Sequence, residues 1–176
     1  MNQILTPSNL LDYKDIGQTA NAISGDTKII SIIEEAQLTD LKDALGDKFY
    51  FDLLSNLDNP IYQDLLSGST FNYCGVSYYQ NGIKALLADY FMAKYILVVN
   101  TNLTGFGAVI KHNNNSEPVD RNSLKDYSNF QLKLASSKLE IIRYYLNSNT
   151  SKFPNWKNNS ITGESTSNRR FRFRKL

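Results

Sequence analysis

The sequence predicts a mainly α-helical protein: a helical bundle of about four to five helices around a central apolar helix, with a small β-hairpin and an extended C-terminal tail. Three observations support this fold class. Residues 81–100 are apolar on nearly every helical face. Other segments repeat apolar residues at steps of three and four, the spacing of one helix face. Residues 69–80 are instead rich in Thr, Phe, Tyr and Val, which is typical of extended chain.

Length and composition limit the classes of protein to which the chain can belong. Its 176 residues suffice for one domain that buries about 70% of the surface its unfolded form exposes. Cys74 is the only cysteine, so an internal disulfide is excluded. No secretory signal pattern is apparent, which predicts synthesis in a reducing cytoplasm. Lys84, Asp89 and Lys94 interrupt residues 81–100, so we expect a core helix there and no membrane anchor.

The first half of the chain is expected to hold an N-terminal arm and then short helices. Residues 1–23 show no sustained period and allow one helical turn after Ser8. The first sustained helix should be capped by Asp26 or Thr27. Helical spacing continues in residues 39–54, where Gly46 marks either a break or a close contact, and in residues 61–66, closed by Gly68.

The second half is expected to hold a hairpin, the central helix and one long last helix. Gly75 can turn residues 69–80 into a hairpin, whereas residues 101–107 are expected to form a loop and 108–110 a short strand at most. The last helix should begin at Asp120 or Asn122, and its wide apolar stripe predicts packing against two partners. The stripe and its flank comprise Leu132, Ala135, Leu139, Ile142 and Leu146, with Tyr127, Phe130, Leu134, Ile141 and Tyr145.

Charge is divided unevenly along the chain. The net charge is +2, but residues 151–176 hold seven basic residues and one acid, a net +6, which leaves −4 for residues 1–150. A basic tail on an acidic body predicts that the tail docks on something acidic, either nucleic acid or a neighbouring copy. We therefore divide the chain into an N-terminal arm (1–23), a helical domain (24–148) and an extended basic C-terminal tail (149–176).

Residues that could carry chemistry are few. His112 has no Cys or second His nearby to share a metal, and zinc sites need three or four such ligands. Cys74 has no partner at a useful spacing, which favours packing over a nucleophile. Gly105 and Gly107 lack the Lys and Ser/Thr of a phosphate-binding loop. We therefore expect no catalytic residue, no metal and no cofactor.

Acidic residues recur along one predicted helix. They are Asp40, Asp43, Asp47 and Asp52, preceded by Glu34 and Glu35. Paired carboxylates can perform acid–base or Mg²⁺ chemistry, for which Asp43 and Asp47 would be the residues to test. Acids opposite an apolar stripe are more often a solvated face, and a negative surface for a basic partner is the third interpretation.

The strongest candidate binding segment is in the tail. Its arginines and phenylalanines alternate, so an extended chain presents arginines on one side and rings on the other. Such a segment can dock on a partner, with the rings in pockets and guanidinium groups on acids. Two alternatives remain: the segment is a disordered basic terminus, or it binds nucleic acid through its arginines and aromatic rings. The residues are Arg169, Arg170, Phe171, Arg172, Phe173 and Arg174.

Several blocks of sequence together resemble a known family. They are Gly46–Leu54, Tyr62–Gly68, Gly82–Tyr95, Thr104–Gly107 and Ser116–Pro118. Over residues 26–150 the chain is similar to the head–tail connector, or adaptor, proteins of tailed bacteriophages, especially those of Bacteroidetes phages and the crAss-like group. The blocks are packing motifs with no catalytic signature. The chain departs from the compact adaptors in having both an N-terminal arm and a long tail.

The resemblance implies a structural virion protein of the phage neck, made in the bacterial host cytoplasm. Such a subunit joins a ring, by family habit of twelve copies, beneath the portal protein, and contacts further neck or tail proteins. Double-stranded DNA passes through the ring without being read, and a terminal segment clasps the portal. The alternative from the residues alone is a nucleic-acid-binding module acting through the Arg/Phe tail.

Overall fold

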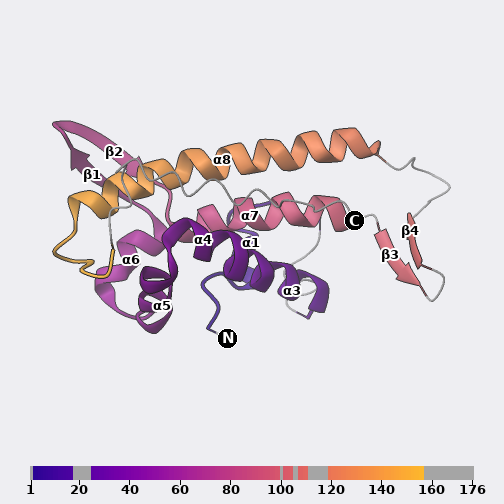
Figure 1. Cartoon of the computed structure of the whole chain (residues 1–176), viewed down its shortest axis with the longest axis horizontal. Helices are drawn as coiled ribbons and strands as arrows, with labels where there is room; N and C mark the ends of the chain where they lie inside the picture. The colour runs from indigo at the N-terminus through magenta and orange to yellow at the C-terminus, as the bar shows by residue number, and fades with distance from the viewer. Residues whose placement is uncertain (1, 18–24, 100, 105–106, 111–118, 157–176) are drawn as a thin grey trace, which may run out of the picture.

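The computed structural model describes residues 2–17, 25–99, 101–104, 107–110 and 119–156 (Figure 1). The described chain is mainly helical, with two small antiparallel hairpins, so the predicted mainly α fold class is confirmed. One large apolar cluster draws on nearly every helix. The helices therefore share a single core.

Helix α7 (Ile83–Val98) lies in the middle of the body. Ten of its sixteen residues are buried. Helix α8 (Arg121–Ser148) packs along one side of α7, and α3 (Thr27–Ala36) and α6 (Pro60–Ser67) contact it elsewhere (Figure 1). The apolar residues around α7 thus meet protein on most sides, as a core helix requires.

The segment before α5 is helical but changes its winding. Of the two predicted caps, Asp26 and Thr27, it is Asp26 that caps α3, by accepting hydrogen bonds from the backbone amides of Lys28 and Ile29. A π-helical turn, η1 (Gln37–Leu41), then runs directly into α4 (Lys42–Leu45). Such a turn inserts an extra residue into the helix and so redirects the side chains that follow.

Gly46 separates α4 from α5 (Asp47–Ser55). Its φ of +78° is a conformation that glycine adopts without strain, and it ends one helix where the next begins. Of the two interpretations of Gly46, a break is therefore the one that the structure has. Helix α6 then begins after Asn59, whose side chain accepts from the amide of Ile61, and ends at Gly68.

The predicted aromatic hairpin is present. Strands β1 (Ser69–Tyr73) and β2 (Val76–Gln80) pair in antiparallel register across a two-residue turn. Cys74 and Gly75 both have positive φ, +50° and +79°, which suits the right-handed twist of paired strands. The hairpin packs on the second half of α8, where Phe71 contacts Tyr145 edge to face.

A second hairpin contradicts one prediction. Residues 101–107 were expected to form a loop, but β3 (Thr101–Thr104) pairs with β4 (Gly107–Ile110). The predicted short strand over 108–110 corresponds to β4. Four-residue strands carry too short an alternation to be distinguished from a loop, and it is the pairing between Thr101 and Ile110 that defines the hairpin.

The N-terminal arm, residues 2–17, is part of the core. It contains the short helix α1 (Pro7–Leu10), with Leu5 and Leu10 fully buried. Gln37, also fully buried, accepts from the amide of Ile4 and donates to the carbonyl of Asn2, both at 2.9 Å. This side chain satisfies backbone groups of the arm that would otherwise lose water without compensation.

A buried carboxylate joins the arm, α7 and α8. The side chain of Asp89 is fully buried, and its two oxygens lie 2.6 Å from Lys14 Nζ and 2.7 Å from Lys138 Nζ. Lys14 Nζ also donates to Gln131 Oε1 at 2.6 Å. Two cations from opposite ends of the chain therefore neutralise a single acid in the central helix.

The first residues of the predicted tail also pack on the body. Phe153 is fully buried and Trp156 nearly so, and both rings contact Phe49 edge to face. Trp156 Nε1 donates to Asn147 Oδ1 at 2.8 Å. Residues 149–156 thus return from the end of α8 to α5, whereas residues 157–176 lie outside the described chain.

Replacing Asp89 by alanine should lower the free energy of unfolding by about 3–5 kcal/mol, because two lysines would lose the acid between them. Urea denaturation measures the change. Glu35→Ala is the control: Glu35 pairs with Lys94 near solvent, and its loss should cost less than about 1 kcal/mol. Equal effects of the two substitutions would contradict a special role for the buried acid.

Candidate interaction surfaces

Several residues singled out from the sequence lie outside the described chain. They are Arg169, Arg170, Phe171, Arg172, Phe173 and Arg174 of the tail, together with Gly105 and His112. Their roles therefore stay predictions. Cys74 is described and was expected to pack, but it is exposed, because it occupies the turn of the β1–β2 hairpin.

The acidic residues predicted along one helix are divided between helices. Asp40 and Asp43 precede the break at Gly46, whereas Asp47 and Asp52 follow it on α5. Asp40, Asp47 and Asp52 contact different partners. Asp40 pairs with Lys94, Asp47 pairs with Lys42, and Asp52 accepts a hydrogen bond from the Tyr62 hydroxyl. Within the described ranges, no three His, Cys, Asp or Glu side chains are grouped to hold a metal ion.

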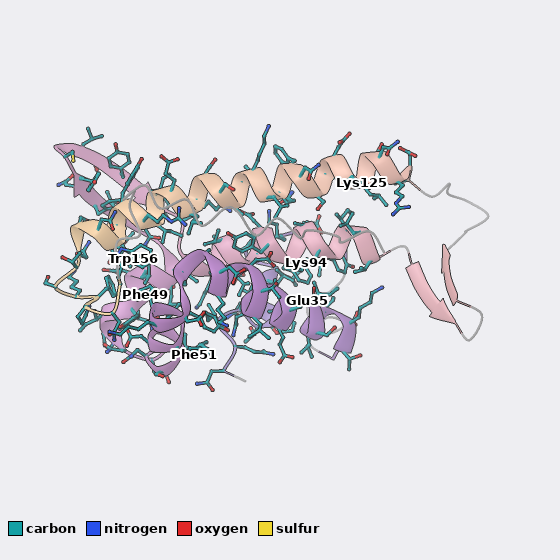
Figure 2. The ribbon with its side chains drawn as sticks, viewed as in Figure 1. Glu35, Phe49, Phe51, Lys94, Lys125 and Trp156 are labelled. Carbon is teal, nitrogen blue, oxygen red and sulfur yellow. The ribbon has the colours of Figure 1, made fainter. Side chains whose placement is uncertain are left out.

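Polar contacts between α3, η1 and α7 are structural in character. Lys94 lies 3.3 Å from Glu35 and 3.2 Å from Asp40, and Figure 2 shows Glu35 and Lys94 on neighbouring helices. Burial lowers the pKa of Lys94, but the hydrogen bonds and charges of Asp40 and Glu35 outweigh it and raise the pKa above its usual value. The ammonium group therefore stays charged and holds the two helices together.

Two tyrosines are held in the neutral form. Burial and then the nearby charge of Asp40 raise the pKa of Tyr90 to about 12, although the charge of Arg143 acts in the opposite direction. Burial and then the 2.6 Å hydrogen bond to Asp52 raise the pKa of the Tyr62 phenol far above its usual range. Neither phenol is prepared to act as a base near neutral pH.

The β1–β2 hairpin and α8 share an aromatic cluster. Tyr73 and Tyr144 stack with ring centroids 5.1 Å apart, and Tyr144 donates to Glu140 Oε1 at 2.6 Å. At the turn and the outer side of the hairpin, Val76 and Tyr79 remain more than half exposed. The cluster fixes the hairpin to the second half of α8 and leaves its outer side exposed.

The outward half of α8 carries apolar side chains without a described partner. The structure buries the predicted stripe from Ala135 onward, but its first member, Leu132, is 40% exposed. From the flank expected to meet a second partner, Tyr127 and Phe130 are 43% and 54% exposed. Basic residues accompany them. We define the α8 face as Lys125, Tyr127, Phe130, Leu132 and Lys133, all exposed.

Exposed apolar side chains also lie on α5 and α6. Phe51 and Ile61 are 54% and 49% exposed, and each has an aspartate about one helical turn away. Figure 2 shows Phe51 on the side of the body away from α8, where Lys125 is labelled. We define the α5–α6 face as Asp47, Phe51, Asp58, Ile61 and Asp64, all exposed.

The model of a family of unknown function, DUF6712, matches residues 41–166. The chain belongs to this family. The match covers α4 to α8 and therefore both of the faces defined above, but not α1 or α3. No curated protein and no solved structure matches the chain.

The structure also bears on the apolar stretch of the sequence. Among the described residues, no helix combines the length and hydropathy needed to span a bilayer. Residues 83–98 form a helix that is buried by its neighbours, as the charged residues within it predicted. Sequence reasoning missed the partners of Asp89, although a charge in the middle of an apolar run was the available signal.

The Tyr90 pKa gives a testable pH dependence. An unfolded tyrosine ionises near pH 10, whereas folded Tyr90 ionises near pH 12. The stabilising contribution of neutral Tyr90 is therefore present below pH 10 and is lost as the pH rises from about 10 to about 12. Tyr90→Phe should therefore make the free energy of unfolding fall less steeply over that range. Urea denaturation across alkaline pH measures it, and curves parallel to wild type would contradict the assignment.

Proposed function

We propose that this chain is a structural virion protein, a head-to-tail connector that forms a ring in the neck of a tailed bacteriophage. The ring lies beneath the portal protein, and double-stranded DNA passes through it without being read. The sequence resemblance to phage adaptors supports this function. Its blocks in Gly46–Leu54, Tyr62–Gly68 and Gly82–Tyr95 correspond to α5, α6 and α7, whose residues fill the core.

The observation that carries the proposal is the presence of exposed apolar side chains on opposite sides of the body. Phe130 on α8 and Phe51 on α5 are each 54% exposed, and α7 lies between the two helices (Figure 1). Exposed apolar surface rimmed by polar residues marks interaction sites. A subunit with two different contact sides can join neighbours head to tail and close into a ring.

The tail supplies the second contact in this proposal. Its last described residue is Trp156, which is anchored on Phe49. The thirteen residues from there to Arg169 span at most about 45 Å when extended, close to the roughly 42 Å length of α8. An extended linker of this length would allow the Arg/Phe segment to contact a neighbouring copy or the portal protein.

A nucleic-acid-binding module is the second candidate function. The observation in its favour is the charge of α8, which has five basic and two acidic residues over Arg121–Ser148 and so adds a positive surface to the basic tail. Against it, residues 25–67 hold nine acids and three bases, which would repel DNA phosphates from that side.

Purified protein should assemble into rings, alone or when mixed with the portal protein of the same phage, because contact with other chains removes its two apolar sides from water. Light scattering after gel filtration gives the mass, and negative-stain electron microscopy gives the shape and symmetry. The resemblance predicts twelve copies. Protein that stays monomeric under both conditions would contradict the connector function.

Tail variants should separate docking from DNA binding. If the tail docks on protein, Phe171→Ala with Phe173→Ala should weaken assembly, because the rings would no longer fill pockets, while the arginine charge is kept. Removing residues 168–176 should do so too. If the tail binds DNA, deletion should abolish a steeply salt-dependent affinity for duplex DNA, measured by fluorescence anisotropy, and the alanine variant should keep most of it.

A further inference from the structure

The two faces lie on different elements and on different sides of the body. Helix α8 packs on α7 and on the β1–β2 hairpin, whereas α5 and α6 adjoin α4, α7 and the strap of residues 149–156 (Figure 1). Phe51 and Lys125 are labelled on opposite sides of α7 in Figure 2. One copy therefore cannot bring its α8 face onto its own α5–α6 face.

The faces carry opposite charge. Residues 42–67 hold five aspartates and two lysines, a net −3, while Arg121–Ser148 has a net +3. Lys138 is neutralised by Asp89 beneath the surface, and the remaining bases are exposed. Two α8 faces would repel each other, and so would two α5–α6 faces, but an α8 face and an α5–α6 face attract.

Each face also carries an apolar anchor beside its charges. On α8, Lys133 follows the exposed Phe130 by one turn, and on α5, Asp47 precedes the exposed Phe51 by one turn. Aromatic side chains at the centre of a patch, with charges around them, are the usual composition of a protein contact. Each face also has one exposed residue of the opposite sign, Asp126 on α8 and Lys48 on α5, and the net charges given above include both.

We propose that the α8 face of one copy docks on the α5–α6 face of the next copy, placing Phe130 against Phe51 and Ile61, with Lys125 and Lys133 beside Asp47, Asp58 and Asp64. The contact is heterologous: each copy uses one face for each neighbour, so the same contact repeats from copy to copy. This inference rests on the proposed assembly and specifies the interface that forms it.

Charge reversal tests the pairing. Lys125→Glu with Lys133→Glu makes both faces negative, and Asp47→Lys with Asp58→Lys makes both positive, so each double variant should self-associate about tenfold more weakly or worse. An equimolar mixture of the two should assemble again, because each reversed face then meets its complement. The quadruple variant should assemble by itself. Light scattering and sedimentation measure all four samples beside wild type.

A matched control reverses charges elsewhere. Asp12→Lys with Lys84→Glu changes one acid and one base, neither of which lies on α5, α6 or α8, and should assemble like wild type. If wild type assembles and the reversals do not change this, the interface is assigned wrongly while the connector function stands. If a double variant is weakened and neither the mixture nor the quadruple variant recovers, the pairing is also overturned.

Cysteine cross-linking gives an independent readout that detects even a weak contact. In a Cys74→Ser background, Phe51→Cys combined with Phe130→Cys should form a ladder of disulfide-linked oligomers on mild oxidation. Either substitution alone should give only monomer, because a heterologous contact never brings two equivalent positions together. Denaturing gels without reductant show the result.

The other outcomes are equally distinct. Dimers from Phe130→Cys alone would mean that α8 pairs with itself, which overturns the proposal. A ladder that disappears when residues 157–176 are removed would overturn docking by the α8 face alone, because the contact would then require the tail. Assemblies without cross-links overturn the interface only, whereas absence of both assemblies and cross-links overturns the connector function as well.

Discussion

The buried carboxylate of Asp89 is the interaction on which the arrangement of the body depends. An ionised acid in an apolar interior is costly unless cations lie close to it. Lys14 of the arm and Lys138 of α8 meet this requirement from two sides of α7, at 2.6 and 2.7 Å. The central helix therefore packs favourably only with both of these elements in place, and the apolar contacts along α7 add to this constraint.

This constraint also determines which surfaces remain free. With α7 enclosed between α8 and the short helices α3 to α6, the acidic helices and the basic helix end up on different sides of one body. The aromatic strap of Phe153 and Trp156 binds to the inner side of α5 and leaves Phe51 outside. A body with two unlike sides can bind further copies head to tail. This property is the basis of the function and of the interface proposed above.

Features that depend on neighbouring residues followed from the sequence. Asp26 and Asp120 cap their helices because a short acidic side chain reaches amides two or three residues ahead. Gly75 forms the turn of the aromatic hairpin, and residues 83–98 form the buried helix. Both were predictable because turn conformation and apolar spacing depend on residues that are close together in the sequence. The mainly α fold class and the wide apolar stripe of α8 were predictable for the same reason.

What only the tertiary structure decided involves residues far apart in the chain. Asp89 is separated by dozens of residues from both lysines that neutralise it, and Phe153 contacts Phe49, which lies far earlier in the chain. The sequence alone determined that α8 has a second apolar flank; the packing decided that Phe130 on that flank stays exposed. Periodicity specifies which residues share a face, but burial depends on which distant element covers that face.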